Sequence, residues 1–169
     1  DHASCHQPAP CARRPVAEVA GGDYCGRLAN LCGYRELGDV AQTLFDHFNQ
    51  GNALFRQQRF AEALEQYDLG LALRPGQPRL LLNRGQALRN LGRDNDAIEA
   101  LEASARAEPT NPEPLKALAQ LLYALRRPDE AAACAARALE LDPQDGALQA
   151  LRGVALRMAR RPGEAIAAF

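Results

Sequence analysis

The sequence predicts an all-α fold in which antiparallel helix pairs stack in a line. The first reason is a repeat of 34 residues, a period typical of repeat architectures. The second is the helical spacing of apolar residues within each copy, as in Leu64, Tyr67 and Leu71. The third is composition. Aromatic residues make up only 5% of the chain, while alanine, leucine, arginine and glutamate are plentiful, which favours helices over strands.

Five columns of similar residues keep the 34-residue step in phase. They are a proline column, an alanine column, a column of glycine or alanine, a leucine column and an acidic column, in this order: Pro75, Pro109 and Pro143; Ala63, Ala97, Ala131 and Ala165; Gly51, Gly85, Ala119 and Gly153; Leu54, Leu88, Leu122 and Leu156; Glu62, Asp96, Glu130 and Glu164. Agreement of five columns over three or more copies indicates a true repeat. We expect an array over residues 44–169, divided into 44–77, 78–111, 112–145 and a truncated 146–169.

Each copy contains two expected helices joined by a short polar turn. The first helices are expected at 44–57, 79–91, 113–125 and 147–159, and the second helices at 60–73, 95–107, 129–141 and from 163 to the end. Pro128 and Pro162 suit the first turn of a helix, whereas the proline column follows helix ends, where proline prevents continuation. The acidic column suits the exposed N–H groups of a helix start.

The two columns of small residues have a mechanical explanation. A side chain larger than alanine would hold two antiparallel helices apart, so glycine or alanine in the first helix facing alanine in the second permits close packing. Leucine and isoleucine then fill the layer between successive pairs.

The pattern resembles the tetratricopeptide repeat (TPR) family. The small pair Gly85 and Ala97, Leu81 and Leu88, the closing Pro109 and their equivalents carry the resemblance. It implies a right-handed superhelix with a concave groove lined by the first helices. The chain departs from the family pattern at one usually aliphatic column and at one that favours a large apolar residue: Gln50, Arg84 and Arg152; His47 and Gln149.

Residues 1–43 form a different, cysteine-containing segment. It is rich in proline and glycine at its start, and a packing helix is expected near residues 24–37. Its cysteines are candidates for disulfides: Cys5, Cys11, Cys25 and Cys32. Three interpretations stay open: small buried apolar residues, two disulfides in an exported protein, or a zinc site together with His6. No C-x-x-C pair is present, so the spacing does not favour zinc.

No catalytic pattern emerges, and we expect the chain not to be an enzyme. The histidines His2, His6 and His47 form no recognisable nucleophile–base spacing, and no glycine-rich phosphate loop is present. We expect no cofactor and no metal. Twenty basic and 21 acidic residues give a net charge of −1, which argues against a generic binder of nucleic acid or anionic membranes. The apolar runs are too short to insert into a membrane.

The expected activity is binding through the groove. Amides can hold a peptide backbone, arginine can grip a carboxylate, and aromatic rings can receive apolar side chains. The candidate groove residues on the first helices are Phe48, Asn49, Asn52, Phe55, Arg56, Arg79, Asn83, Gln86, Arg89, Lys116, Gln120 and Tyr123. Ala117 is expected on the same face.

Two TPR subtypes can be compared residue by residue. Asn52 and Asn83 resemble the asparagine half of the clamp with which chaperone-binding TPR domains hold a terminal carboxylate, but Phe48, Glu113 and Ala117 stand where its cations are expected. The asparagine ladder of glycosyltransferase TPR domains is matched by Asn49 and Asn83 only, because alanine and leucine follow in the next repeats.

The sequence therefore predicts a protein- or peptide-binding adaptor. One alternative is a targeting module of a larger enzyme, for example a transferase, whose catalytic part lies outside this chain. A second is a redox or metal role of the cysteine segment. The sequence ends within an amphipathic pattern, which predicts self-association through the apolar residues of an uncapped end, Ala165 and Ile166 among them. The arginine- and alanine-rich composition suggests a GC-rich bacterial source. A bacterial cytoplasm is the favoured location, whereas disulfides among the N-terminal cysteines would indicate an exported or periplasmic protein.

Overall fold

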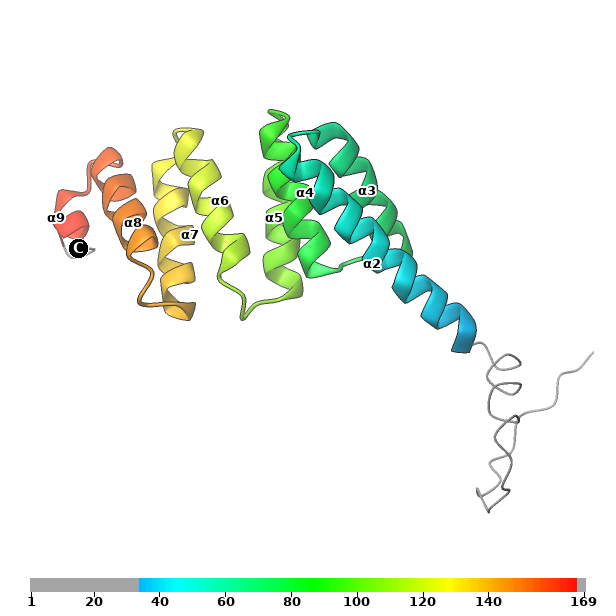
Figure 1. The fold of residues 1–169 in the computed structure, drawn as a ribbon. Coiled ribbons are helices and arrows are strands. Elements are labelled where there is room, and N and C mark those ends of the chain that lie inside the picture. The colour runs from blue at the N-terminus through cyan, green and yellow to red at the C-terminus, as the bar shows by residue number, and fades with distance from the viewer. Residues whose placement is uncertain (1–33, 167–169) are drawn as a thin grey trace, which may run out of the picture. The chain divides into compact units, whose positions relative to one another are not determined.

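The structure is a computed structural model that describes residues 34–166, with side chains from residue 40 onward. The chain divides into two compact units, Asp1–Leu37 and Gly38–Phe169. Every regular element in the described part is an α-helix, in the order α2 (Tyr34–Arg56), α3 (Phe60–Leu73), α4 (Pro78–Asn90), α5 (Asp94–Ala107), α6 (Glu113–Ala124), α7 (Pro128–Leu141), α8 (Gly146–Met158) and α9 (Pro162–Ile166). The predicted all-α stack is confirmed (Figure 1).

The helices lie where the repeat predicts them, with one extension. Helix α3 has the expected bounds, and most other ends differ by a single residue. Helix α2 instead begins at Tyr34 and continues through residue 43, because nothing in that stretch forbids a helix: it contains no proline and only one glycine, Gly38. Residues 24–33 of the packing helix expected at 24–37, together with Cys5, Cys11, Cys25 and Cys32, lie outside the described residues. The division of the chain at residue 43 stays a prediction.

A left-handed residue ends the first helix of every repeat. Gln58, Gly92, Arg126 and Arg160 have φ values of 61°, 73°, 60° and 59°, and they are again 34 residues apart. The next backbone N–H then reaches back to the last turn of the helix, as from Arg59 to the Leu54 carbonyl at 3.0 Å. The same bond recurs in each later repeat, so a glycine-type helix ending is used four times, three times without glycine.

The arginine that follows this turn pairs with the acidic column. Arg127 donates to Glu130 at 2.7 and 2.6 Å, and Arg161 donates to Glu164 at 2.8 Å. The equivalent pairs are Arg59 with Glu62 and Arg93 with Asp96. The acids occupy first turns, as predicted, but sequence analysis missed their arginine partners, which also recur every 34 residues.

Glycines of the first helices make room for large side chains of the second helices. A Cβ at Gly51 would collide with the ring of Tyr67, and one at Gly85 would lie 2.8 Å from Leu101 Cγ. In the third repeat, alanine takes the place of both partners, and Ala119 and Ala135 are fully buried in one cluster. The predicted small-residue contact is therefore matched to partner size: glycine faces tyrosine or leucine, and alanine faces alanine.

A second small column joins successive repeats. Gly70 sits against Leu80, and Ala138 packs in a cluster with Leu148. Between them in sequence, Ser104 instead bonds within its own helix pair: its buried hydroxyl donates to the Pro78 carbonyl at the start of α4 at 2.9 Å. At Gly70 and Ala138, a small residue late in one helix pair thus makes room for a leucine near the start of the following pair.

Polar contacts replace the apolar ones at two departures from the family pattern. His47 Nδ1 lies 2.9 Å from Gln66 Oε1, which ties α2 to α3. Arg84 Nε donates to Asp68 at 2.7 Å, which ties α4 to α3. These positions exchange hydrophobic packing for hydrogen bonds between neighbouring helices.

The first helices of neighbouring repeats contact one another. Helix α4 touches α6, and α6 touches α8, in addition to the contacts between helices adjacent in sequence. This arrangement brings α2, α4, α6 and α8 to the face that the resemblance assigns to a groove. In the part of the chain from residue 34 to 166, no helix has the length and apolar character needed to cross a membrane.

The predicted apolar end is only partly exposed. Ile166 is 78% exposed, but Ala165 is 7% exposed because it belongs to the main core cluster. The expectation that Ala165 adds to an exposed apolar patch is therefore wrong. Self-association through this end stays a prediction.

Candidate functional site

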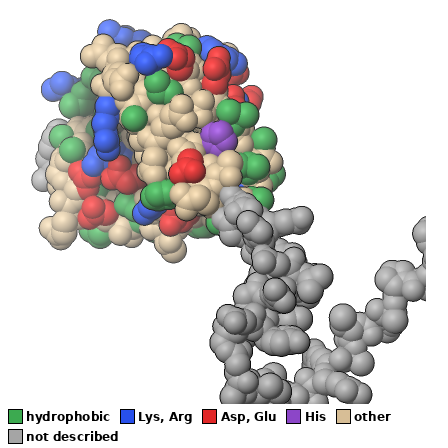
Figure 2. Space-filling view, turned by 45° about the vertical axis from the view of Figure 1, so that its right-hand side comes forward, with side chains coloured by type: hydrophobic (Ala, Val, Ile, Leu, Met, Phe, Trp, Pro, Cys, Tyr) green, Lys and Arg blue, Asp and Glu red, His purple; other side chains and the backbone are tan. Residues whose placement is uncertain are grey.

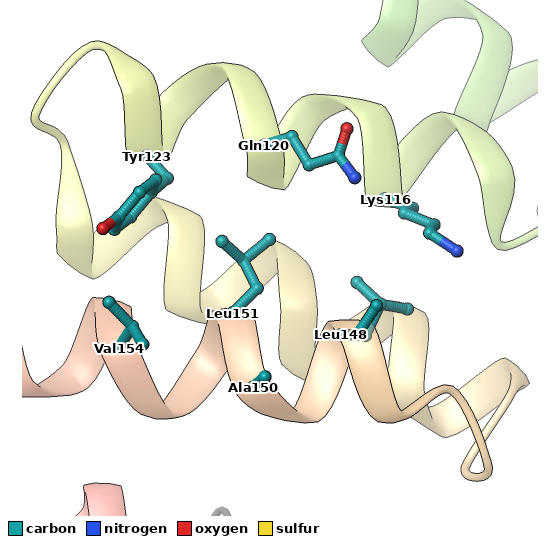
Figure 3. Close-up of a pocket in the computed structure, with 8 residues that line it drawn as sticks. Lys116, Gln120, Tyr123, Leu148, Ala150, Leu151 and Val154 are labelled. Atoms are coloured by element: carbon teal, nitrogen blue, oxygen red, sulfur yellow. The ribbon is translucent and has the colours of Figure 1, made fainter.

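A hollow of about 300 Å³ opens between α6 and α8. Its α6 wall consists of Lys116, Gln120 and Tyr123, three of the residues predicted for the groove. Leu148 and Leu151 point from α8 toward α6 (Figure 3). The remaining lining comes from small or branched apolar residues of α8: Ala147, Ala150 and Val154. The hollow thus combines an apolar wall with three polar side chains, a composition suited to one apolar group of a ligand.

The cation of this hollow is already paired. Lys116 Nζ lies 2.6 Å from Asp145 Oδ2, and the other carboxylate oxygen accepts from the backbone N–H groups of Ala147 and Leu148 at 2.9 and 3.1 Å. The lysine hydrogen bond, followed by the one from Leu148, lowers the pKa of Asp145 from 3.8. Asp145 also raises the pKa of Lys116, chiefly through the same hydrogen bond. The only lysine therefore joins α6 to the start of α8 as well as bordering the hollow.

A second hollow of about 290 Å³ lies between α2 and the start of α4. Phe45 and Phe48 line it from α2, and Arg79 and Leu80 line it from α4. Ala41, Leu44, Arg74 and Gln77 complete the lining. Phe45 is 58% exposed, so a large aromatic ring is presented to solvent next to two arginines. Phe48 and Arg79 are brought together here, as the groove prediction requires.

The two clamp-like asparagines bond to each other. Asn83 Nδ2 donates to Asn52 Oδ1 at 2.7 Å, and the hydroxyl of Tyr67 donates to the same oxygen at 3.0 Å. The Tyr67 ring is buried, and burial raises the pKa of Tyr67 to about 12. Asn52 therefore has a structural role, because its side chain joins α2, α3 and α4. The sequence did not predict this role.

The remaining candidates differ in exposure. Asn49, Arg56, Arg89 and Gln120 are exposed, while Phe55 and Gln86 are half-buried. Phe55 packs edge-on against Phe60, with ring centroids 5.1 Å apart, so it closes the first helix pair.

Ala117 is not part of the face. It is only 8% exposed and packs in the core with Leu118 and Leu121. The expectation that Ala117 lines the groove is wrong, because its helical position turns it toward the neighbouring helices.

Cys134 on α7 is the only cysteine among the described residues, and its thiol is free. Burial raises its pKa, and its side chain packs against both core clusters. Among the side chains of residues 40–166, no group of histidine, cysteine and acidic residues could hold a metal ion. Cys5, Cys11, Cys25 and Cys32 lie outside these residues.

Two tetratricopeptide repeat models match the chain, one over residues 48–112 and the other over 95–154. The chain belongs to the tetratricopeptide repeat family. The two matches together span most of the described helices, and the 34-residue columns are those of TPR units. No curated protein sequence matches the chain.

Solved TPR structures share the fold. A crystal structure of MamA superposes with a TM-score of 0.65 at 23% identity, covering 70% of this chain and 69% of MamA. YrrB, described as a TPR protein with an unusual peptide-binding site, gives a TM-score of 0.68 at 21% identity, covering 81% of this chain and 71% of YrrB. The first TPR domain of Spaghetti (RPAP3), bound to the HSP90 peptide SRMEEVD, gives 0.60 at 24% identity, covering 75% and 94%. These likenesses establish the TPR solenoid.

Proposed function

We propose that this TPR chain is a protein- or peptide-binding scaffold that uses the face formed by α2, α4, α6 and α8. The observation that carries the proposal is the hollow between α6 and α8, where predicted groove residues meet an apolar wall. Two of the similar structures are of peptide-binding TPR proteins, which supports the same use of the fold here.

The two hollows are suited to holding side chains of a partner. Each is bordered by first helices, and each combines apolar walls with side chains that donate hydrogen bonds. Between them lie Asn83 and Gln86, whose amides can both donate to and accept from a peptide backbone. A binding face assembled in this way can hold a partner in an extended or helical form by one apolar anchor at each hollow.

The proposal is tested by site-specific photo-crosslinking in the source cell. A benzoyl-phenylalanine placed at Gln120 lies at the α6–α8 hollow, and the matched control at Arg106 lies on the second-helix side. Both positions are exposed and helical, so both variants should fold. We expect discrete crosslinked products from position 120 and few from position 106.

The Asn83→Ala and Arg89→Glu variants complete the test. Each should reduce the crosslinking from position 120 while the helical circular dichroism stays unchanged. Equal crosslinking from both positions, or products from position 120 that neither variant reduces, would overturn the proposal.

A further inference from the structure

The two layers of helices carry opposite charge. Between residues 40 and 166, the first helices α2, α4, α6 and α8 hold seven basic and two acidic residues. The basic residues are Arg56, Arg79, Arg84, Arg89, Lys116, Arg152 and Arg157, and the acidic ones are Asp46 and Glu113. Helices α4 and α8 contain no acidic residue at all.

The second helices show the reverse. Helices α3, α5, α7 and α9 hold eleven acidic and two basic residues: Glu62, Glu65, Asp68, Asp94, Asp96, Glu99, Glu102, Asp129, Glu130, Glu140 and Glu164; Arg106 and Arg137. The net charge of −1 conceals this division. On the face that Figure 2 shows, basic and acidic side chains are interspersed, so the asymmetry emerges only when each charge is assigned to its helix.

In the described part of the chain, most exposed helix arginines without an ion pair also lie on the first helices; Arg137 on α7 and the turn residues Arg74, Arg126 and Arg160 are unpaired as well. The turn residues Arg59, Arg93, Arg127 and Arg161 pair with the acidic column. On the first helices, Arg84 pairs with Asp68, and Lys116 pairs with Asp145. Within the described residues, no ion pair engages the exposed arginines Arg56, Arg79, Arg89 and Arg157. All four lie on first helices, and Arg79 borders the α2–α4 hollow. The proposed binding face thus combines unpaired arginines with two apolar hollows.

We propose that the partner held by this face is an acidic protein segment whose side-chain carboxylates meet these arginines and whose apolar side chains fill the two hollows. The inference rests on the proposed function and names its partner class. Arginine forms paired hydrogen bonds with a carboxylate, and unpaired cations on one face favour an anionic partner over a basic one. The acidic second helices repel the same segment, so charge also selects the face.

The acidic segment lies within the partner's chain and not at its C-terminus. A terminal carboxylate is best held by several cations that converge on one point, but of the free arginines on the first helices only Arg79 borders a hollow, beside the turn residue Arg74. The free arginines are instead distributed over α2, α4 and α8, which suits several acidic side chains along a segment.

The test begins with selection from a phage-displayed library of random dodecapeptides on the full 169-residue chain. Selected peptides are synthesised with a fluorescent label and titrated by anisotropy, each with a free and an amidated C-terminus. We expect enrichment in aspartate, glutamate and large aliphatic residues, and equal affinity of the two terminal forms.

Matched variants then locate the site. Arg89→Glu should weaken binding about tenfold, since one charge-assisted hydrogen bond contributes that much. Arg106→Glu makes the same charge change on α5, where the side chain is 71% exposed, and should leave affinity nearly unchanged. Ala150→Trp should block the α6–α8 hollow, whereas Ala133→Trp, at an exposed position of α7, should not.

The outcomes separate the inference from the proposed function. Groove-dependent peptides without acidic enrichment would overturn the inference and leave the function standing. A tenfold preference for the free C-terminus, equal loss in Arg89→Glu and Arg106→Glu, or acidic peptides insensitive to every groove variant would also overturn the inference. Selection of no peptide, together with concentration-dependent self-association abolished by Arg89→Glu, would replace the acidic segment with a second copy of this chain.

Discussion

The hydroxyl of Tyr67 and the carboxamide of Asn52 are joined by a hydrogen bond of 3.0 Å that connects the core to the proposed binding face. The same Asn52 oxygen accepts from Asn83 at 2.7 Å. A residue expected to touch a ligand therefore also holds three helices together. The proposed function therefore couples binding and stability at this position, and variants can separate them.

Asn52→Ala should destabilise the protein by about 1–3 kcal/mol, because it removes the acceptor of a buried hydroxyl and leaves that group without a partner. Asn49→Ala, one turn earlier on α2 and exposed, should change stability by less than about 0.5 kcal/mol. Urea unfolding followed by circular dichroism measures both. Similar stabilities for the two variants would contradict the structural role of Asn52.

The burial of Tyr67 predicts a dependence of stability on alkaline pH. The pKa of Tyr67 is raised from 10.0 to about 12 by burial, so the folded protein keeps this proton at a pH where the unfolded chain loses it. Its contribution is complete below pH 10.0 and is lost as pH rises toward 12, with a slope of up to about 1.4 kcal/mol per pH unit. Unfolding of the wild-type protein and Tyr67→Phe between pH 9 and 12 tests this. The difference between them should change across that window, and a constant difference would count against it.

The repeat made most of the fold predictable. Five columns with the same period define the helix pairs, because each column occupies the same position of the helix pair in every copy. This is why the bounds of α3 could be predicted to the residue. The start of α2 could not be predicted in the same way, since Tyr34 lies outside the period and no sequence signal marks where the helix begins. Ala117 was misassigned because alanine is small enough to occupy either a core or a groove position.

The sequence predicted which face of the helices carries the candidate site, but not the contacts between its side chains. Helical position brought Lys116, Gln120 and Tyr123 to one hollow, but the ion pair of Lys116 depends on Asp145, just before α8. The bond from Lys116 to Asp145 crosses 29 residues and involves an acid that is absent from the repeat columns. By contrast, the arginine column that pairs with the acids was visible in the sequence at its 34-residue step and could have been found.

The close fit between Gly85 and Leu101 predicts that the effect of Gly85→Ala on stability depends on residue 101. Gly85→Ala places a methyl group 2.8 Å from Leu101 Cγ, and the clash should outweigh the gain in helix propensity, giving a net destabilisation of about 1–2 kcal/mol. Leu101→Ala alone should cost about 2–5 kcal/mol through the cavity it leaves. In that background Gly85→Ala should become neutral or stabilising, because the pair then copies Ala119 and Ala135.

Chemical unfolding of the single and double variants gives the coupling free energy, which we expect to be about 1–3 kcal/mol. Gly146→Ala is the control, since a Cβ there meets no atom within 4 Å. Additive effects of the two substitutions would show that the size match does not govern this contact.

The left-handed turn column predicts a stabilising substitution. Arg126 has a φ of 60°, a region that is unfavourable for a side chain with a Cβ, whereas Gly92 occupies the equivalent place at 73°. Arg126→Gly should stabilise the protein by about 0.5–1 kcal/mol, the lost backbone strain exceeding the added flexibility of the unfolded chain. Gly92→Ala should destabilise the protein by a similar amount. Thermal unfolding measures both, and the same sign for both variants would refute the strain argument.

The ion pair between Lys116 and Asp145 predicts how the last full repeat responds to acid. Hydrogen bonds from Lys116 and the start of α8 hold the pKa of Asp145 below 3.8, so this carboxylate contributes stability above that pH and loses it as pH falls through the lower, folded-state pKa. Lys116→Met removes the larger cause, and the pKa of Asp145 should rise toward its ordinary value.

Carbon-detected NMR of the side-chain carboxyl groups follows that titration directly, while acid unfolding should move to a higher pH in Lys116→Met. Arg157→Met makes the same charge change on α8 at an exposed position and should leave both quantities near their wild-type values. An unaltered Asp145 titration in Lys116→Met would mean that the backbone N–H groups of α8 alone set its pKa. Lys116 would then be available to contact a ligand in the α6–α8 hollow, and its substitution should affect binding without affecting stability in acid.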